Sequence, residues 1–452
     1  MIVIDTALSR PLFDRKSLTK LIVPLIAEQF LLIAVGMADT VMVASVGEAA
    51  VSGISLVDQI NNLLIQVFAC LATGGSVICA QYIGKKDAVR ASQAAKQLLY
   101  AATGIAILIA IFSITCNGAI IDLIFGSLDA DVRANAITYF YLTAASFPFL
   151  ALYNAGAALM RAKGNSRITL ILSCVMNGLN IAGNAILIFI CGWGVAGAAA
   201  ATLFSRMVAS VIITWRLTKP DPLLRIEKLL SYRPNLDLIR RILRIGIPTG
   251  IEGAMFQLGK LLVAGFVATF GTAAIAANAV CNSVITLVAI PGNAISLAIV
   301  TVVGQCLGAG ETKQAERNAR NLMLLSYSLC FLMSAVMLIG ANPIVGVYNI
   351  SPEATEIAVR IIKSFGLFAI VFWPASFVLP NVLRAAGDVR YAMTVSMTSI
   401  WTMRVVAAYI LGGWCGWGIY GTWAGMYLDW IFRASFFGIR FLRGKWKQFK
   451  VV

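Results

Sequence analysis

The sequence predicts an all-α membrane protein whose twelve transmembrane helices form two six-helix bundles related by a pseudo-twofold axis along the membrane normal. Three observations predict this class. Of the 452 residues, 60% are apolar and 12% are charged, whereas soluble domains contain about 25% charged residues. Twelve apolar runs are long enough to cross a bilayer. The second half of the chain also repeats the first at a nearly constant offset.

The twelve apolar runs follow one another with short connections, as in a polytopic membrane protein. Their predicted starts are near Leu21, Gly53, Gln93, Ala134, Ile168, Val195, Ile242, Ala273, Asn321, Ile357, Tyr391 and Gly418. Lys and Arg gather in every second connection. The segments 1–20, 81–92, 161–167, 216–244, 304–320, 384–390 and 433–450 hold 29 of the 36 Lys and Arg. The opposite loops hold one, Arg133. By the positive-inside rule, both termini are expected in the cytoplasm of a cell-membrane protein.

The longest internal connection, 218–241, contains three prolines and a dense mixture of charges. This composition is typical of a linker between two units. We therefore expect an N-lobe at 1–217, a cytoplasmic linker at 218–241 and a C-lobe at 242–452.

The two lobes are predicted to be copies of each other. An offset of 224 residues superposes VASVGEAAV (43–51) on VATFGTAAI (267–275) and CGWGVAG (191–197) on CGWGIYG (415–421). MRAKGN, from 160, matches LRAAGD at an offset of 223. Because six spans is an even number, both copies enter the membrane in the same direction. Parallel repeats of this kind occur in transporters whose two halves rock around a central site.

Several charged residues interrupt the apolar spans, where a charge at the bilayer centre costs about 2.5–3.5 kcal/mol. Asp39 lies deep in span 1 and is the strongest functional candidate. For Asp58 and Asp429, pairing that only holds helices together is an equally good interpretation. Lys260 and Arg404 are the clearest basic counterparts within the spans.

Glu28 and Glu252 occupy matching positions, each four residues after a proline, Pro24 and Pro248. A proline frees a backbone carbonyl about one turn away. Capping of the kink and a functional role therefore both remain open for these two acids.

Span 5 carries three amides on one helical face, Asn177, Asn180 and Asn184, and Thr202 follows in span 6. Amides in lipid often join helices by hydrogen bonds. The same stripe would also supply oxygen ligands to a small cation.

Motifs of enzymes and ATP-driven pumps are missing. The chain has no histidine, so any proton transfer must use carboxylates. The sequence contains no phosphate-binding GxxxxGK[ST] loop, no GxSxG or HExxH motif and no CxxC pair. We therefore expect no enzymatic activity, no cofactor and no binding of nucleic acid.

Over essentially its full length the chain resembles the multidrug and toxic compound extrusion (MATE) transporters. The resemblance rests on MADTVMVASVG in span 1, QYIG with KKD after span 2, RAKGNSR after span 4, NGLNIAGN in span 5, IGIPTGIEG opening span 7 and GQCLGAGE after span 8. Members exchange H⁺ or Na⁺ for organic, often cationic and aromatic, compounds.

The resemblance implies an N-lobe ion-coupling site at Asp39, Asn180, Asn184 and Thr202, with Asp39 and Asn180 as the ligands if the ion is Na⁺. Many prokaryotic members have an aspartate where this sequence has Asn184, so the coupling ion, H⁺ or Na⁺, stays open. Span 10 lacks the acid of NorM-like members. Glu252 resembles the span-7 acid of some members, although its offset from the preceding proline differs.

We thus expect a secondary active antiporter that exports small organic substrates as a monomer in the lipid bilayer. The candidates for the substrate cleft or for secondary coupling are Glu28, Asn177, Glu252, Lys260 and Arg404. The alternative is a flippase for lipid-linked oligosaccharides, in which Lys260 and Arg404 would bind pyrophosphate. A non-transporting receptor is a third class, but no extramembrane domain supports it.

Overall fold

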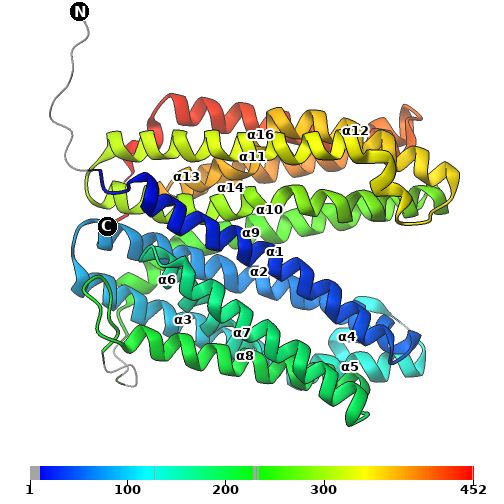
Figure 1. Cartoon of the computed structure of the whole chain (residues 1–452), viewed down its shortest axis with the longest axis horizontal. Helices are drawn as coiled ribbons and strands as arrows, with labels where there is room; N and C mark the ends of the chain where they lie inside the picture. Colours follow the sequence, from blue (N-terminus) through cyan, green and yellow to red (C-terminus); the bar gives the residue numbers. More distant parts are fainter. Residues whose placement is uncertain (1–10, 127, 228–230, 232–233, 450) are drawn as a thin grey trace, which may run out of the picture.

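The computed structural model describes residues 11–126, 128–227, 231, 234–449 and 451–452, and regular structure there is helical (Figure 1). The first half contains α1 (Arg15–Ala44), α2 (Glu48–Gly84), α3 (Ala88–Thr115), α4 (Asn117–Phe125), α5 (Ala130–Ala145), α6 (Phe147–Ala162), α7 (Ser166–Asn184), the π-helix η1 (Ala185–Ile190) and α8 (Gly194–Thr218). The second half contains α9 (Leu236–Ala268), α10 (Thr272–Gly308), α11 (Thr312–Gly346), α12 (Pro352–Trp373), η2 (Pro374–Val378), α13 (Pro380–Ala386), α14 (Val389–Thr398), η3 (Ser399–Val406), α15 (Ala407–Tyr409), η4 (Ile410–Trp414), α16 (Gly418–Leu442) and η5 (Lys445–Gln448).

All twelve predicted spans are found as helices in the predicted order. Among the described residues, ten helical segments are long and apolar enough to cross a membrane, and the pair α5 and α6 adds an eleventh. This pair is bent by 48° beside Pro148, which cannot donate a backbone hydrogen bond. The twelfth span is α16, which is 25 residues long and has the buried residues Asp429 and Arg433 at its centre. The predicted two-bundle membrane architecture is confirmed.

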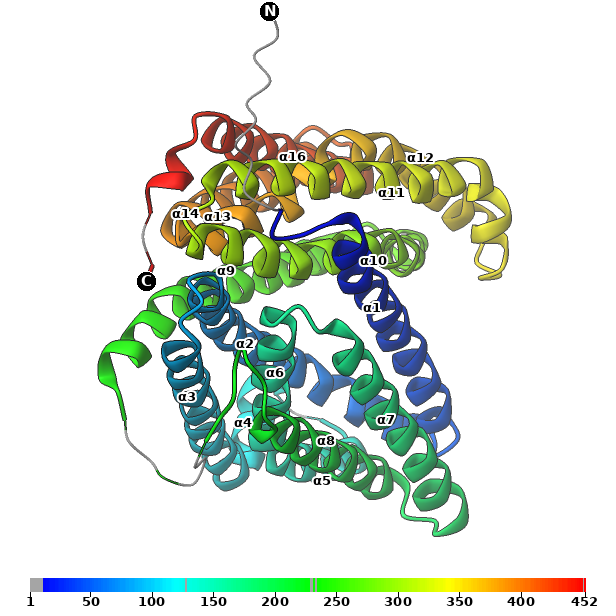
Figure 2. The same cartoon turned by 60° about the vertical axis from the view of Figure 1, so that its left-hand side comes forward.

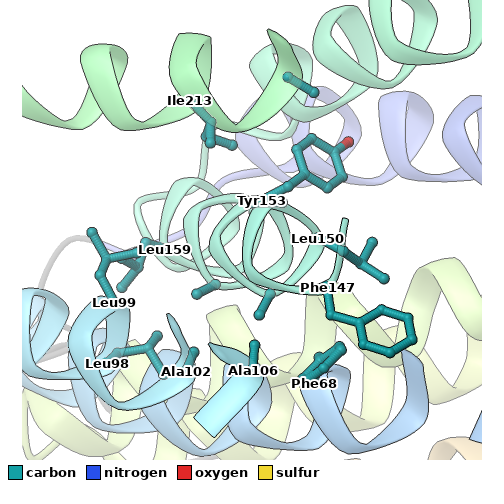
Figure 3. Close-up of a cluster of buried hydrophobic side chains, with 14 of the residues drawn as sticks. Phe68, Leu98, Leu99, Ala102, Ala106, Phe147, Leu150, Tyr153, Leu159 and Ile213 are labelled. Atoms are coloured by element: carbon teal, nitrogen blue, oxygen red, sulfur yellow. The ribbon is translucent and has the colours of Figure 1, made fainter. Parts of the chain in front are cut away.

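Each bundle has its own apolar core. In the N-lobe, α6 lies at the centre and packs against α2, α3 and α8 (Figure 3). Phe68 of α2 and Phe147 of α6 meet with ring centroids 6.0 Å apart. Gly156 of α6 lies against Ile213 of α8, where a Cβ would come within 2.9 Å of that side chain. Small residues at such positions let transmembrane helices approach closely.

The first helix of each lobe reaches into the other lobe. Leu21 and Leu25 at the start of α1 belong to the apolar core of the C-lobe. Ile242 and Ile245 at the start of α9 belong to the core of the N-lobe. Figure 2 shows α1 running obliquely between the two bundles, with α2 and α9 meeting at their interface. The two lobes are therefore tied together at the Lys/Arg-rich end.

The connection between the lobes is shorter than the predicted linker at 218–241, because α9 already begins at Leu236. Its first part docks on the N-lobe, where Leu224 and Ile226 are buried. Lys163 contacts Asp221 at 2.5 Å. Although burial alone would raise the pKa of the Asp221 carboxyl, the hydrogen bond from Lys163 holds that pKa below its usual value. The first part of the charged linker is thus ordered and packs on the surface of the N-lobe.

A reciprocal pair of hydrogen bonds joins the lobes at the Lys/Arg-rich end. Gln81 Nε2 of α2 donates to the Ala385 carbonyl at 2.8 Å. Its repeat counterpart, Gln305 Nε2 of α10, donates to the Ala162 carbonyl at 2.6 Å. Each lobe thus makes the same contact to the other lobe, as is typical of a twofold interface. We call these two bonds the glutamine latch.

Two glycines allow the helices to approach at this latch. A Cβ on Gly84 would lie 2.0 Å from the Gln305 carbonyl oxygen, and a Cβ on Gly308 would lie 2.0 Å from the Gln81 carbonyl oxygen. Since backbone atoms cannot yield as a flexible side chain does, this packing requires glycine on both helices.

Candidate functional site

A cavity of about 1080 Å³ lies between the two lobes. Its wall includes residues of α1 from Glu28 to Val43 and residues of α9 from Thr249 to Phe256. Helices α1 and α9, the first of each repeat, thus face the same space. Of the predicted cleft residues, Glu28, Asn177 and Glu252 line this cavity, whereas Lys260 and Arg404 are not among its lining residues.

The N-lobe wall of the cavity holds the four residues of the predicted ion site together. Half-buried Asp39 of α1 accepts a hydrogen bond at Oδ1 from Asn184 Nδ2 of α7, at 2.9 Å. Asn180, one turn earlier on α7, contacts Thr202 Oγ1 of α8 at 3.1 Å. Residues from three separate helices therefore meet at one carboxylate, as the spacing on span 5 predicts. Their role in coupling remains a prediction.

The amide of Asn180 lies between Asp39 and Thr202. With Nδ2 turned toward Asp39, it donates to the two carboxylate oxygens at 2.8 and 3.0 Å and accepts from Thr202 Oγ1 at 3.1 Å. With the opposite orientation, Nδ2 donates to Thr202 and Oδ1 faces the carboxylate. The first orientation suits an ionised Asp39 with no cation bound, because every donor then meets an acceptor.

Asn184 contributes one oxygen that is free for a ligand. Its side chain is 2% exposed, and its Oδ1 is buried without a hydrogen-bond partner. Buried polar atoms are nearly always satisfied. By contrast, Asn177 Nδ2 donates to Ser173 Oγ within α7, at 3.3 Å, rather than to Asp39. The three predicted amides thus share a face, and two of them reach the carboxylate.

Sequence reasoning missed Arg206 of α8 as a neighbour of this site. Arg206 lines the cavity, donates to Ser146 Oγ at 2.7 Å and interacts electrostatically with Asp39 and Asp58. Asp58 in turn accepts from Tyr139 Oη at 3.4 Å. A lone arginine inside the apolar span 6 was the signal that could have pointed to it.

Glu28 and Glu252 each pair with an arginine of their own lobe. Glu28 Oε1 lies 3.7 Å from Arg161, and its Oε2 accepts from Thr169 Oγ1 at 2.8 Å. Glu252 Oε2 lies 2.7 Å from Arg384. The arginines sit in the repeated RAKGN and RAAGD motifs, so the two ion pairs are repeat counterparts. All four residues line the cavity.

The backbone carbonyl that Pro24 leaves without an amide donor is satisfied without Glu28. Pro24 has no amide hydrogen for the Lys20 carbonyl. Ser166 Oγ of α7 lies 3.2 Å from that carbonyl and 2.6 Å from the Leu21 carbonyl. Ser166 therefore caps the carbonyl that Pro24 leaves free. Glu28 faces the cavity as part of an ion pair.

In the C-lobe, the acid of span 12 forms a separate buried cluster. Asp429 is fully buried, accepts at Oδ1 from Arg433 Nε at 2.8 Å and lies 3.9 Å from Arg404 NH1 through its Oδ2. Lys260 lies on the exposed surface of α9. Among the described residues, no three His, Cys, Asp or Glu side chains are grouped as a metal-binding cluster.

Two six-span repeats around a polar cavity are typical of a membrane transporter. A family model described as MatE matches residues 24–186 and 248–410, and the second match begins and ends 224 residues after the first. The chain belongs to the MatE family. It is a membrane transporter built by duplication of one six-span unit.

Individual proteins and solved structures agree with this assignment. The chain is 29% identical over 440 residues to the "Probable multidrug resistance protein NorM" of Thermotoga maritima, a match that covers 96% of this chain and 93% of that protein. It is 26% identical over 438 residues to the "Uncharacterized transporter YisQ" of Bacillus subtilis, covering 94% of both. The fold matches the "Crystal structure of MATE in the bent conformation" with a TM-score of 0.87 at 20% identity, over 95% of this chain and 94% of that chain.

Proposed function

We propose that the protein is an antiporter that exports organic compounds from the cell in exchange for one cation, H⁺ or Na⁺, bound at Asp39. The observation that carries this proposal is the cluster of Asp39, Asn180, Asn184 and Thr202 in the cavity wall, with a buried, unpartnered oxygen on Asn184. Several relatives are named as probable multidrug resistance proteins, which supports organic substrates for this chain.

The oxygen atoms of the residues around Asp39 could bind either H⁺ or Na⁺. One carboxylate neutralises one monovalent cation, and amide and hydroxyl oxygens are hard ligands of the kind that Na⁺ prefers. A proton needs only the carboxylate. A membrane potential of roughly 150 mV acting on one charge supplies about 3.5 kcal/mol, which sustains roughly a 300-fold gradient of a neutral substrate.

The charge of the loops supports an orientation of the cavity in the membrane. With the Lys/Arg-rich loops and both termini in the cytoplasm, the glutamine latch closes the cytoplasmic end of the cavity. We propose that the cavity in this state opens to the outside, from where Asp39 takes up a cation. We further propose that one chain is the transporting unit, because the cavity is lined by two lobes of the same chain.

The charge of the cavity disfavours the alternative of a pyrophosphate-linked substrate. Four acids and four arginines line it, so its formal charge is zero. These residues are Glu28, Asp39, Asp58, Glu252, Arg161, Arg206, Arg384 and Arg433. A site for pyrophosphate would need an excess of cationic donors.

The test is efflux of ethidium from right-side-out membrane vesicles that contain the full chain, driven by an imposed inward gradient of H⁺ or Na⁺. We expect Asp39→Asn to lower gradient-driven efflux to the level of vesicles without the protein, at equal membrane abundance. Glu356→Gln is the matched control, since Glu356 pairs with Arg360 on the exposed surface. Efflux by Asp39→Asn equal to that of the control would refute the assignment.

A further inference from the structure

The two repeats differ most at the position of the N-lobe ion cluster. The offset of 224 residues identifies the C-lobe counterparts; it is set by VASVG and VATFG just after the position of Asp39, and by the two CGWG turns between the positions of Asn184 and Thr202. The counterparts of Asp39, Asn180, Asn184, Thr202 and Ser205 are Val263, Arg404, Ala408, Met426 and Asp429. The carboxylate of span 1 is thus lost from the C-lobe, and an Arg–Asp pair takes the place of a neutral amide and a hydroxyl.

The guanidinium of Arg404 is enclosed in the C-lobe. Arg404 is 7% exposed, and its guanidinium carbon lies 5.0 Å from the centroid of the Phe256 ring. Its NH1 is buried without a hydrogen-bond partner and lies 3.9 Å from Asp429 Oδ2, which also has none. Arg404 therefore contributes a charge to this cluster and no hydrogen bond at NH1.

A local change of helix type places Arg404 there. The repeat offset is 223 at RAKGN and RAAGD but 224 at the CGWG turns, so span 11 has one residue more than span 5. The structure has the π-helix η3 (Ser399–Val406) in this stretch, where span 5 is α-helical. The wider turn of a π-helix accommodates an additional residue. η3 carries both Arg404 and Ser399, whose Oγ donates to Asp429 Oδ1 at 2.6 Å.

The clusters in the two lobes carry opposite formal charges. In the N-lobe, two carboxylates, Asp39 and Asp58, face one guanidinium, Arg206, which leaves one negative charge. In the C-lobe, one carboxylate, Asp429, faces two guanidiniums, Arg404 and Arg433, which leaves one positive charge. A negative excess attracts a cation from solution, whereas a positive excess repels one. The N-lobe cluster therefore needs a cation from solution, whereas the C-lobe cluster does not.

We propose that Arg404 is a tethered cation, which permanently fills in the C-lobe the place that an exchangeable cation takes in the N-lobe. This inference rests on the proposed function for the role of the N-lobe. It limits the transporter to one exchangeable cation per cycle, bound at Asp39. It also makes Arg404 a positioning residue, which fixes spans 11 and 12 around Asp429 whatever the ionic conditions are.

The experiment measures the thermal unfolding midpoint of the purified full chain in detergent. All variants are made in the Asp39→Asn background, so that the N-lobe carboxylate contributes no cation response. Arg404→Lys keeps the charge, Arg404→Met removes it but retains an elongated side chain, and Arg404→Ala also leaves space. We expect Arg404→Lys to keep the midpoint and the other two to lower it by about 5 °C, because Asp429 Oδ2 loses its cationic neighbour.

Chemical rescue is the second measurement. Low-millimolar guanidinium chloride, exchanged against choline chloride at fixed ionic strength, should raise the midpoint of Arg404→Ala in a saturable way. The matched control is Arg404→Ala combined with Asp429→Asn, in which no carboxylate remains to attract the ion and no rescue is expected.

The proposal is overturned if Arg404→Met is as stable as Arg404→Lys, or if guanidinium acts equally on Arg404→Ala and its Asp429→Asn control. Should Arg404→Ala not fold, the comparison of Lys with Met decides. Failure of the proposed function would appear separately, as gradient-driven efflux by Asp39→Asn alone.

Discussion

The N-lobe and the C-lobe keep the same frame but differ in the polar residues inside it. Both retain a Glu–Arg pair at the cavity and one half of the glutamine latch. Within the described parts of the two lobes, only the N-lobe has a carboxylate beside amides, at Asp39. In the function that we propose, the duplicated frame supports a motion common to both halves, and a single lobe binds the ion.

Each lobe has one Glu–Arg ion pair at the cavity, and we expect the loss of such a pair to lower the stability of the protein more than any other change proposed here. Removal of one partner of a buried ion pair costs roughly 3–5 kcal/mol. Glu252→Gln should lower the unfolding midpoint more than Glu28→Gln, because Glu252 contacts its arginine at 2.7 Å whereas Glu28 lies 3.7 Å away and keeps Thr169. Thermal unfolding of the purified protein measures both.

The exposed pair of Glu356 and Arg360 supplies the control for these variants, because its side chains are each 65% exposed. Glu356→Gln should change stability by at most about 1 kcal/mol. An equal midpoint for all three variants would show that the cavity pairs contribute no more than a surface pair.

Closing the glycine gaps at the latch tests whether the two lobes contribute equally to closure. Gly84→Ala and Gly308→Ala each place a Cβ 2.0 Å from a backbone oxygen of the other lobe. Overpacking of this kind costs roughly 1–3 kcal/mol, and the strain is relieved when the Lys/Arg-rich end opens. We expect a longer distance between spin labels at Arg90 and Arg320, to a similar extent in both variants.

Gly104→Ala and Gly265→Ala are the matched controls, one in each lobe, because a Cβ at either position has no other atom within 4 Å. These controls should leave the label distance unchanged. A shift in only one of the two latch variants would contradict the symmetric closure.

Much of this frame could be predicted from the sequence, because repeat offsets and apolar runs depend on residues that are neighbours along the chain. The stripe of Asn180 and Asn184 on span 5 likewise follows from helical periodicity. The partners across helices could not be predicted. Periodicity identifies a face but not the helix opposite to it, so Arg161 as the partner of Glu28 and Arg206 near Asp39 emerged only from the packing.

The boundary of the linker could not be predicted for a different reason. Residues 236–241 are rich in charge and were predicted to lie in the linker, but they form the first turns of α9. Asn235 begins this helix by accepting a hydrogen bond from Leu238 N at 3.1 Å. Asn235, which follows Pro234, is a residue type that often begins a helix, and it was the available sign that a helix starts here. The dense charge of residues 236–241 instead favoured a linker.

Within the proposed ion site itself, we expect a substitution at Asn184 to have a smaller effect than those above. Asn184→Asp would place a second carboxylate next to Asp39, since Asn184 Nδ2 now lies 2.9 Å from Asp39 Oδ1. Two carboxylates at this distance repel each other unless a cation lies between them. The variant should therefore bind Na⁺ more tightly, by roughly tenfold or about 1.4 kcal/mol, seen as a larger rise of the unfolding midpoint over a sodium titration at fixed ionic strength. Asn177→Asp is the matched control, because Asn177 lies on the same face of α7 but bonds to Ser173. If Asn184 only joins helices, both variants should be less stable than the parent and respond to sodium equally, and residue 184 would then be no part of the ion site.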